Sequence, residues 1–224
     1  MQPIAVIDYG MGNLRSVQKG LERVGCAAEI TRDADRIASA PGVVLPGVGA
    51  FGACMDNLRA YGLDEPVRHV IGRGVPFLGI CLGMQLLFEE SDEFGPVKGL
   101  GVFPGRVVRF KDQPGLKIPH MGWNRITKRQ RLRHLEGIDD GTFVYFVHSY
   151  YVESADPSLT ATSTEYGVEF TSAIARDNVF ATQYHPEKSQ EIGLRILENF
   201  GRIVGRQPSA VSRQSIGAGP RDSK

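Results

Sequence analysis

Short apolar runs that alternate with helical patterns place the strongest constraint on the fold of this 224-residue chain. Four runs in its first half have the length and composition of buried strands, at residues 4–8, 27–31, 42–46 and 75–80. Apolar residues recur at helical spacing after them, at residues 14–24, 51–60, 64–73 and 82–90. Strands that alternate with helices form a parallel sheet covered on both faces. The sequence therefore predicts a doubly wound α/β fold.

The second half of the chain has a different pattern. Closely spaced β-rich segments occur at residues 106–110, 142–153, 159–165, 168–175 and 179–184, and a helical pattern follows at 190–204. They predict antiparallel strands added in the C-terminal half to a mostly parallel sheet that helices flank. We therefore expect a single domain over residues 1–205. Residues 206–224 contain almost no large apolar side chains and are expected to form a disordered tail.

Composition and charge exclude several classes of protein. The apolar runs are too short to span a membrane, and the N-terminus lacks the layout of a signal peptide, so we expect a cytoplasmic protein. A net charge of +1 gives no general footprint for nucleic acid. The three cysteines are odd in number, and neither Cys-x-x-Cys nor His-x-x-x-His occurs. We therefore expect no disulfide framework, no metal site and no cofactor.

Cys81 stands in the pentapeptide GICLG, between a predicted buried strand and a predicted helix. G-x-C-x-G is the cysteine version of the nucleophile elbow, a strained turn whose flanking glycines remove side chains that would collide. The start of a helix also favours a thiolate. Free cysteines are often buried structural residues, and the pentapeptide alone does not decide between the two interpretations. Cys26 and Cys54 lack this frame and are interpreted as structural.

His185 is the histidine best placed to serve as the base that a nucleophilic thiol requires. It ends an apolar segment and precedes Pro186, which favours extended backbone at His185. Residues i and i+2 of an extended chain point the same way, so Glu187 is expected to orient the imidazole. Alone, the His-Pro-Glu sequence would fit a turn with a surface glutamate. Together with the elbow, it predicts a triad of Cys81, His185 and Glu187.

The glycine loop PGVG at residues 46–49 leaves another predicted buried strand. Its glycines let the backbone approach a ligand closely, and sites gather at the carboxyl ends of parallel strands. We expect an oxyanion hole formed by the backbone N–H of Leu82 and by a donor from this loop. An ordinary glycine turn is the alternative, and the triad favours the oxyanion hole.

The blocks GICLGMQ and HPEKS, with the glycine loop before them, resemble class I glutamine amidotransferases of the triad type. Within that class, five blocks are similar to the glutaminase subunits of imidazole glycerol phosphate synthase: IDYGMGNLRSV, LPGVGAFG, PHMGWN, YFVHSYY and YHPEKSQEIGLRIL. The resemblance runs from residue 4 to about residue 204. It implies a flavodoxin-like fold over the single domain.

The resemblance also implies a reaction, the hydrolysis of L-glutamine without a cofactor. Cys81 would form a glutamyl thioester, His185 would protonate the departing ammonia, and water would then release glutamate. The second oxyanion donor would come from the peptide between Val48 and Gly49. The implied glutamine-binding residues are Gly47, Gly49, Gln85, Ser149 and Tyr150.

A partner is implied as well, a (β/α)₈ cyclase subunit that forms a heterodimer with the glutaminase. It would use the ammonia to make imidazole glycerol phosphate and an aminoimidazole carboxamide ribonucleotide in histidine biosynthesis. The residues implied at the interface and ammonia passage are Asn13, Met121, Trp123, Asn124, Tyr145 and Lys188. No nucleic-acid or membrane partner is implied.

Two other functions remain open on the sequence. An autonomous cysteine amidase or peptidase would turn over its substrate without a partner, and a non-catalytic interaction module would retain only the fold. The glycine loop, Gln85 and the PHMGWN block favour the glutaminase subunit. The basic stretch RITKRQRLRH at residues 125–134 is interpreted as a solvated loop or hairpin.

Overall fold

The computed structural model of the protein describes residues 2–205, and the expected tail at 206–224 lies outside them. The first half alternates strands and helices, as predicted. Its strands are β1 (Ile4–Ile7), β2 (Ala28–Thr31), β3 (Val43–Gly47) and β4 (Phe77–Cys81). Its helices are α1 (Leu14–Arg23), α2 (Ala34–Ser39), α3 (Phe51–Ala60), α4 (Asp64–Gly72) and α5 (Leu82–Gln85). The apolar pattern does not predict the short helix α2.

Strands dominate the second half, also as predicted. They are β5 (Phe88–Ser91), β6 (Val97–Lys98), β7 (Phe103–Arg109), β8 (His120–Arg125), β9 (Thr127–Lys128), β10 (Phe143–His148), β11 (Tyr150–Ser154), β12 (Thr160–Glu165), β13 (Glu169–Arg176) and β14 (Val179–Thr182). Three short 3-10 turns are η1 (Arg133–Leu135), η2 (Pro157–Leu159) and η3 (Pro186–Lys188), and helix α6 (Gln190–Gly205) follows. None of the helices in the described residues is both long and apolar enough to cross a bilayer.

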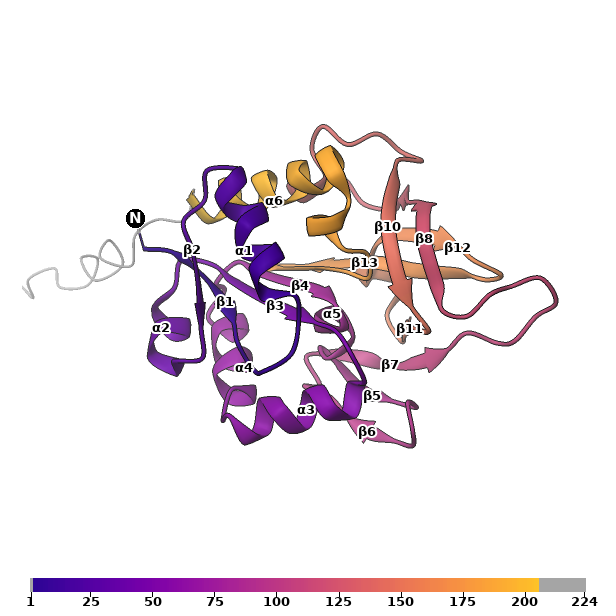
Figure 1. The fold of residues 1–224 in the computed structure, drawn as a ribbon, viewed down its shortest axis with the longest axis horizontal. Helices are drawn as coiled ribbons and strands as arrows, with labels where there is room; N and C mark the ends of the chain where they lie inside the picture. The colour runs from indigo at the N-terminus through magenta and orange to yellow at the C-terminus, as the bar shows by residue number, and fades with distance from the viewer. Residues whose placement is uncertain (1, 206–224) are drawn as a thin grey trace, which may run out of the picture.

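One 12-stranded sheet runs through the described part of the chain in the order β2-β1-β3-β4-β14-β13-β11-β7-β5-β6 (Figure 1). The strands from β2 to β14 in this order are parallel, whereas β13 and β11 add antiparallel pairs. β12 pairs with β13 and β9, and β8 pairs with β10 in a separate two-stranded sheet. The predicted fold class is confirmed. β14 lies beside β4, so the strand that leads to His185 is the neighbour of the strand that ends at Cys81.

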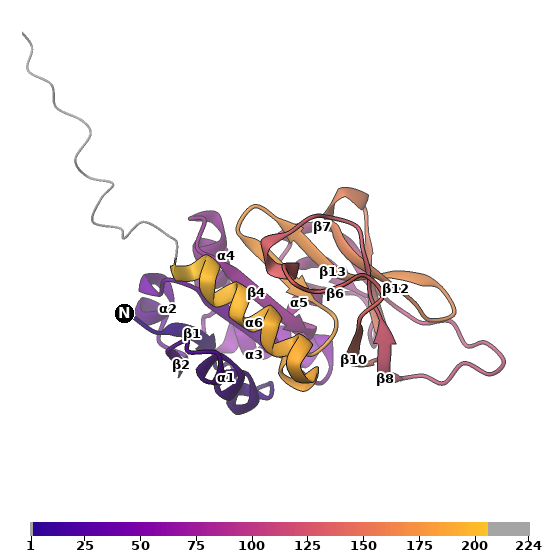
Figure 2. The same ribbon diagram turned by 90° about the horizontal axis from the view of Figure 1, so that it is seen from above.

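Alternate residues of the central strands face two different cores. Ala5 and Ile7 belong to the core under α2, α3 and α4, whereas Ile4 and Val6 belong to the core under α1 and α6. Figure 2 shows α6 lying across the sheet with α1 beside it. Apolar side chains on both faces are what parallel strands require when helices cover both sides.

The predicted helix over residues 82–90 is wrong beyond Gln85. There α5 ends, and Phe88–Ser91 is the strand β5, which pairs with β6 and β7. Backbone carbonyls of residues 86–88 accept hydrogen bonds from N–H groups of residues 100–103 instead of from helical partners. Tertiary pairing therefore overrides the helical pattern. A four-residue helix carries a smaller dipole than the predicted one, so it gives less support to a thiolate at Cys81.

The basic stretch is solvated, as interpreted. It contains the short strand β9 and the turn η1, and its four arginine side chains are exposed, at positions 125, 129, 131 and 133. Arg129 pairs with Glu169 at 2.8 Å, and Arg125 lies over the Phe143 ring.

Candidate active site

Cys81 lies at the junction of β4 and α5 with a backbone φ of 55° and ψ of −113°. A positive φ is strained for a residue that carries a side chain. The flanking glycines allow the tight approach of neighbouring segments. A Cβ at Gly83 would lie 1.9 Å from the Leu45 carbonyl oxygen, and one at Gly79 would lie 2.9 Å from the Ala181 side chain. The junction of β4 and α5 at Cys81 thus has the geometry of the nucleophile elbow that the sequence predicts.

His185 and Glu187 form a buried pair at the same site. The imidazole Nδ1 lies 2.8 Å from the carboxylate Oε1, and both side chains are only 1% exposed. His185 has the extended backbone predicted before Pro186, but Glu187 lies in the turn η3 and not in an extended chain. Among the described residues, His185 Nε2 has no hydrogen-bond partner. This nitrogen is therefore the one available to exchange a proton with a thiol.

The electrostatics of the pair favour a charged imidazole. Burial alone lowers the pKa of His185, but the nearby Cys81 and Glu187 outweigh it and raise that pKa to about 10. His185 can therefore hold a proton at neutral pH. A proton held beside the nucleophile is what a departing amine or ammonia needs.

A cavity of about 310 Å³ opens over Cys81. It is lined by Val48, Gly49, Cys81, Leu82, Gln85, Glu93, Pro119, Val147, His148, Ser149, Tyr150 and His185. These include each predicted glutamine-binding residue except Gly47. Gly47 is buried in β3, where a Cβ would lie 2.9 Å from the Gly83 backbone nitrogen. Its position supports close packing of the elbow and not contact with the cavity.

Gln85 donates both of its amide hydrogens within the protein. Its Nε2 lies 3.0 Å from the Tyr150 carbonyl oxygen and 2.8 Å from Gln183 Oε1. The Gln85 carbonyl oxygen is thus the group left to face a ligand. Gln183 in turn donates to Cys81 Sγ at 3.7 Å. The sequence predictions miss Gln183, although a polar residue that follows a buried strand, two positions before His185, is a usable signal.

Glu93 is a second residue that the sequence predictions miss. Its side chain lines the cavity, and its Oε2 accepts a hydrogen bond of 2.6 Å from the Phe51 N–H at the start of α3. The helix N-terminus stabilises the carboxylate, and the second oxygen is left for a cation such as the ammonium group of an amino acid. No motif marks Glu93, because it lies in the loop between β5 and β6.

Val48 and Gly49 form the edge of the cavity in the loop between β3 and α3. Gly49 has a φ of 104°, which favours glycine. The Cys54 thiol donates to the Val48 carbonyl at 3.6 Å, so the trans peptide directs the Gly49 N–H away from Cys54. Within the described residues this N–H has no acceptor. It and Leu82 are the two predicted oxyanion donors, and both residues border the cavity that holds Cys81.

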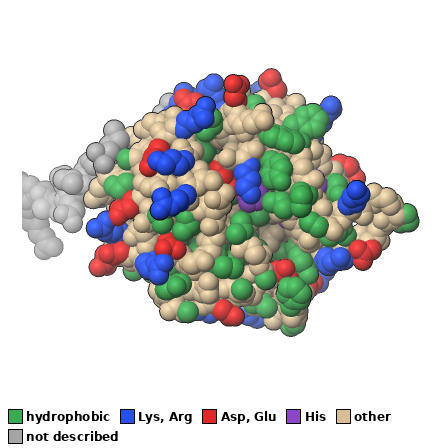
Figure 3. All heavy atoms as spheres, viewed as in Figure 1, with side chains coloured by type: hydrophobic (Ala, Val, Ile, Leu, Met, Phe, Trp, Pro, Cys, Tyr) green, Lys and Arg blue, Asp and Glu red, His purple; other side chains and the backbone are tan. Residues whose placement is uncertain are grey.

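Four of the predicted interface residues gather around the outer face of the β8–β10 sheet. Trp123 and Tyr145 are cross-strand partners with ring centroids 6.0 Å apart, and Lys188 Nζ lies 5.9 Å from the centre of the Tyr145 ring. Met121 is 63% exposed and Trp123 is 46% exposed. Figure 3 shows hydrophobic side chains gathered over β8 and β10. Exposed methionine and aromatic side chains of this kind are enriched at protein interfaces.

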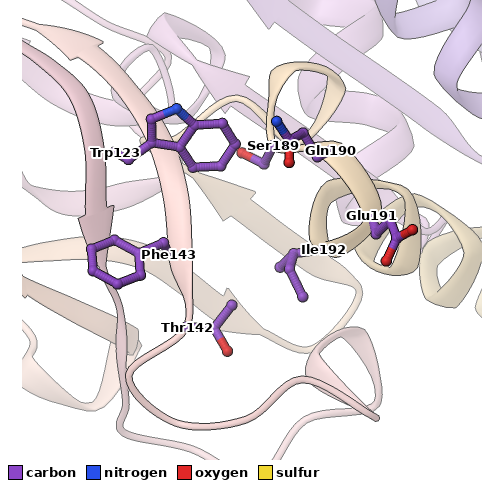
Figure 4. A pocket seen from close by; sticks show the side chains of 7 residues that line it. All are labelled: Trp123, Thr142, Phe143, Ser189, Gln190, Glu191 and Ile192. Carbon is purple, nitrogen blue, oxygen red and sulfur yellow. The ribbon is translucent and has the colours of Figure 1, made fainter.

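A second hollow, of about 450 Å³, extends this outer face to the start of α6 (Figure 4). Trp123 and Phe143 lie on one side of it and the first residues of α6 on the other. Its remaining lining residues are Thr142, Ser189, Gln190, Glu191 and Ile192.

Two predicted interface residues lie elsewhere. Asn124 is on the inner face of the β8–β10 sheet, where it donates to His120 Nε2 at 3.2 Å and to the Glu165 carbonyl at 2.9 Å. Asn13 occupies the N-cap position of α1 without a capping hydrogen bond from its side chain. It is not among the residues that line either cavity.

Two buried histidines, His120 and His148, and the half-buried His134 give the fold a sensitivity to acid. Burial lowers the pKa of His148 to about 3 and the pKa values of His120 and His134 to about 4. Below pH 6.5 these groups take up protons in the unfolded chain but not in the folded one. The unfolded state then binds more protons, so folding stability falls as the pH falls.

We expect the free energy of unfolding to decrease by up to about 1.4 kcal/mol per pH unit for each of these histidines between pH 6.5 and pH 5. His185 is protonated in the folded state throughout this range but only half protonated in the unfolded chain at pH 6.5, so it opposes the slope near pH 6.5 and adds almost nothing by pH 5. Urea unfolding at pH 7, 6 and 5 measures the effect. His134→Phe, which retains a ring against Phe180 at the site of the present 4.5 Å stacking, should reduce the slope between pH 6 and pH 5 by about a third. A stability that does not change over this range would contradict the assignment.

Known proteins match this chain over most of its length. The family described as "Glutamine amidotransferase class-I" matches residues 5–204. The chain is 57% identical to the imidazole glycerol phosphate synthase subunit HisH of Syntrophotalea carbinolica, over 88% of this chain and 98% of that protein. It is 54% identical to HisH of Geobacter sulfurreducens, over 91% of this chain and 100% of that protein.

Solved structures share the fold at low sequence identity. A glutamine amidotransferase crystal structure matches with a TM-score of 0.70 and 19% identity, over 90% of this chain and 99% of that chain. The glutaminase domain of Trypanosoma brucei CTPS matches with a TM-score of 0.69 and 14% identity, over 93% of this chain and 95% of that chain. The match to the family over nearly all the described residues, together with its close relatives, identifies the chain as a member of the class I glutamine amidotransferase family, in the group of HisH subunits of imidazole glycerol phosphate synthase.

Proposed function

We propose that this protein is the glutaminase subunit of imidazole glycerol phosphate synthase and that it hydrolyses L-glutamine to glutamate and ammonia. The observation that carries the proposal is the strained Cys81 in one cavity with the buried pair of His185 and Glu187. Cys81 attacks the side-chain amide carbon of glutamine, with the proton of its thiol already held by His185. The negative charge that develops on the amide oxygen is stabilised by the N–H groups of Leu82 and Gly49.

Collapse of this intermediate breaks the carbon–nitrogen bond. His185 gives its proton to the departing nitrogen, which leaves as ammonia, and a glutamyl thioester remains on Cys81. A water molecule then attacks the thioester while His185 accepts one of its protons. Glutamate leaves as the carbon–sulfur bond breaks, and that proton stays on His185. Glu187 keeps the imidazole in the orientation that these transfers require.

The amino-acid end of glutamine is held by groups that face the cavity. The Gln85 carbonyl and the Glu93 carboxylate are acceptors for the α-ammonium group, and the segment of Ser149 and Tyr150 supplies polar groups for the α-carboxylate. Val48 and Gly49 close the side of the cavity next to the reacting amide.

A cyclase subunit is the proposed partner, bound in a heterodimer at the outer face of the β8–β10 sheet. The exposed Met121 and Trp123 support a docking surface there, and Tyr145 and Lys188 lie beside the triad segment, where ammonia would leave. The cyclase uses this ammonia to make imidazole glycerol phosphate and aminoimidazole carboxamide ribonucleotide in histidine biosynthesis. We place the complex in the cytoplasm and treat residues 1–205 as one catalytic domain.

Glutamate release from L-glutamine tests the proposal. It is measured for the purified chain alone, with the cyclase subunit, and with that subunit and its phosphoribulosyl formimino-carboxamide nucleotide. We expect a low rate alone that rises sharply with the liganded partner. A high rate that does not respond to the partner would favour an autonomous amidase. No release under any of these conditions would favour a non-catalytic module.

Glu187→Ala is expected to be the mildest of the three triad substitutions, lowering kcat by about 100-fold. The carboxylate orients and supports His185 but takes no part in bond breaking. The rate of glutamate release by the liganded complex provides the measurement, with His185→Ala and Cys81→Ala assayed in parallel. A Glu187 variant as inactive as the Cys81 variant would contradict this assignment of roles.

A further inference from the structure

A run of hydrogen bonds on the inner face of the β8–β10 sheet starts at Asn124. The Asn124 amide nitrogen lies 2.9 Å from the Glu165 carbonyl oxygen, and its Oδ1 accepts the Arg125 N–H at 2.8 Å. These two neighbours fix which end of the amide is nitrogen. That nitrogen can only donate, so His120 Nε2, at 3.2 Å, must be the acceptor. The proton of a neutral His120 therefore lies on Nδ1.

The other end of the run gives the same assignment independently. His148 Nδ1 lies 2.8 Å from the Tyr150 carbonyl oxygen, which can only accept, so Nδ1 of His148 carries a proton. A neutral His148 then offers Nε2 as an acceptor. His120 Nδ1 lies 3.0 Å from that Nε2, and the donor deduced from one end meets the acceptor deduced from the other. Both rings are thus neutral and each has one defined tautomer.

The surroundings of the two rings maintain that state. His120 stacks on Tyr166 at 3.9 Å and on Phe146 at 4.7 Å between ring centroids, and Phe110 packs against His148. Burial in this aromatic environment lowers the pKa of both histidines and keeps them uncharged. A proton added to either ring would place two N–H groups face to face.

From Tyr150 the run continues to the nucleophile. The Tyr150 carbonyl accepts from His148 on one side and from Gln85 on the other. Gln85 also donates to Gln183 Oε1, which directs the Gln183 amide nitrogen towards Cys81 Sγ. Each donor between Asn124 and Cys81 meets an acceptor.

Strand β8, which carries His120 and Asn124, also carries the outer docking surface. Along β8, Met121 and Trp123 point outward, whereas His120 and Asn124 point to the buried face because side chains alternate along a strand. A partner seated on the outer face therefore fixes the strand from which the run of hydrogen bonds begins.

We propose that His120 and His148 are positioning residues, through which the partner-facing strand β8 fixes the Tyr150 carbonyl and the Gln85–Gln183 pair beside Cys81. This inference rests on the proposed glutaminase function. It assigns to the PHMGWN block a role inside the domain, in addition to its role at the interface.

The test uses His120→Phe in complex with the liganded cyclase subunit. Phenylalanine retains a ring that can stack but cannot donate to His148. We expect the KM for glutamine to rise by about tenfold with kcat within about threefold of the wild-type value, because the loss affects a binding group and not the triad. A KM within twofold of wild type in the folded complex would overturn the proposal. So would a loss confined to kcat. Wild-type turnover in the same assay tests the proposed function separately.

Two further variants distinguish the hydrogen bond from packing. His120→Asn loses the ring but places an amide N–H where Nδ1 stood, so we expect a KM within about threefold of wild type. A purely structural role predicts the reverse order, with Asn more harmful than Phe. His134→Phe is the matched control, a half-buried stacked histidine outside the run, and should leave the KM unchanged.

Asn124→Asp tests the end of the hydrogen-bond run that is farthest from Cys81, with almost no change in the shape of the side chain. A carboxylate oxygen in place of the amide nitrogen cannot donate to His120 Nε2 or to the Glu165 carbonyl. The His120 ring, which its aromatic surroundings keep neutral, must then donate from Nε2, which removes the proton from Nδ1 and breaks the bond to His148. We expect a rise in KM of about tenfold at saturating partner, and this variant remains informative if His120→Phe does not fold. An unchanged KM for Asn124→Asp would overturn the proposal.

Discussion

Cys81→Ala is expected to lower glutamate release by at least about 1000-fold while leaving the complex with the cyclase subunit intact. The side chain lost carries the thiol that lies in the cavity with His185, and no other thiol in the described residues lines that cavity. Alanine retains the Cβ that the strained turn already accommodates. The fold and the outer face of the β8–β10 sheet should therefore be unaffected.

Two measurements separate catalysis from assembly for this variant. Co-purification with the cyclase subunit should be unchanged, and the complex should still make imidazole glycerol phosphate when ammonia is supplied directly. Cys26→Ala is the matched control, because Cys26 lies outside the cavity, and its activity should stay within about twofold of wild type. Loss of the complex in the Cys81 variant would contradict the separation of catalysis from docking.

Gly83→Ala is expected to damage both the stability of the fold and the release of glutamate. The added Cβ would lie 1.9 Å from the Leu45 carbonyl oxygen, which belongs to the neighbouring strand β3 and cannot move without disturbing the sheet. We expect a loss of about 3 kcal/mol or more in the free energy of unfolding. Glutamate release should fall with it, since Leu82 and the elbow shift together.

Urea unfolding measures this loss, with Gly72→Ala as the control. Gly72 lies in α4, and a Cβ there meets no heavy atom within 4 Å. The control should change stability by less than about 1 kcal/mol and in the stabilising direction, because alanine restricts the unfolded chain. A Gly83 variant as stable as this control would show that the close packing of the elbow against β3 contributes little to the free energy of unfolding.

Local signals predicted most of the fold. Apolar runs such as 42–46 and the helical spacing of α1, α3 and α4 depend on neighbours in the chain, and the structure contains all of these elements. The error at residues 86–90 has a non-local cause. The hydrogen bonds that convert this segment into β5 come from residues 97–107, and no property of the segment itself reveals them.

The same distinction applies to the site. Cys81, His185 and Glu187 could be predicted because each stands in a short pattern with a backbone or chemical reason. Glu93 could not be assigned in this way, because its importance comes from a contact with Phe51, which is far away in sequence. Gln183 has a local signal, its position after a buried strand, but that signal does not reveal its contact with Gln85. The block PHMGWN also does not reveal to which face of β8 Asn124 points.

The pairing of β14 with β4 has a consequence for the newly made protein. Ribosomes synthesise the chain from its N-terminus, so Cys81 leaves the ribosome before the residues of β14 have been added. Until that strand inserts between β4 and β13, the reactive sulfur has neither its imidazole nor a closed sheet beside it. Under the proposed mechanism, the nascent polypeptide therefore cannot hydrolyse glutamine, and catalytic competence arrives only when β14 is in place and His185 lies beside Cys81.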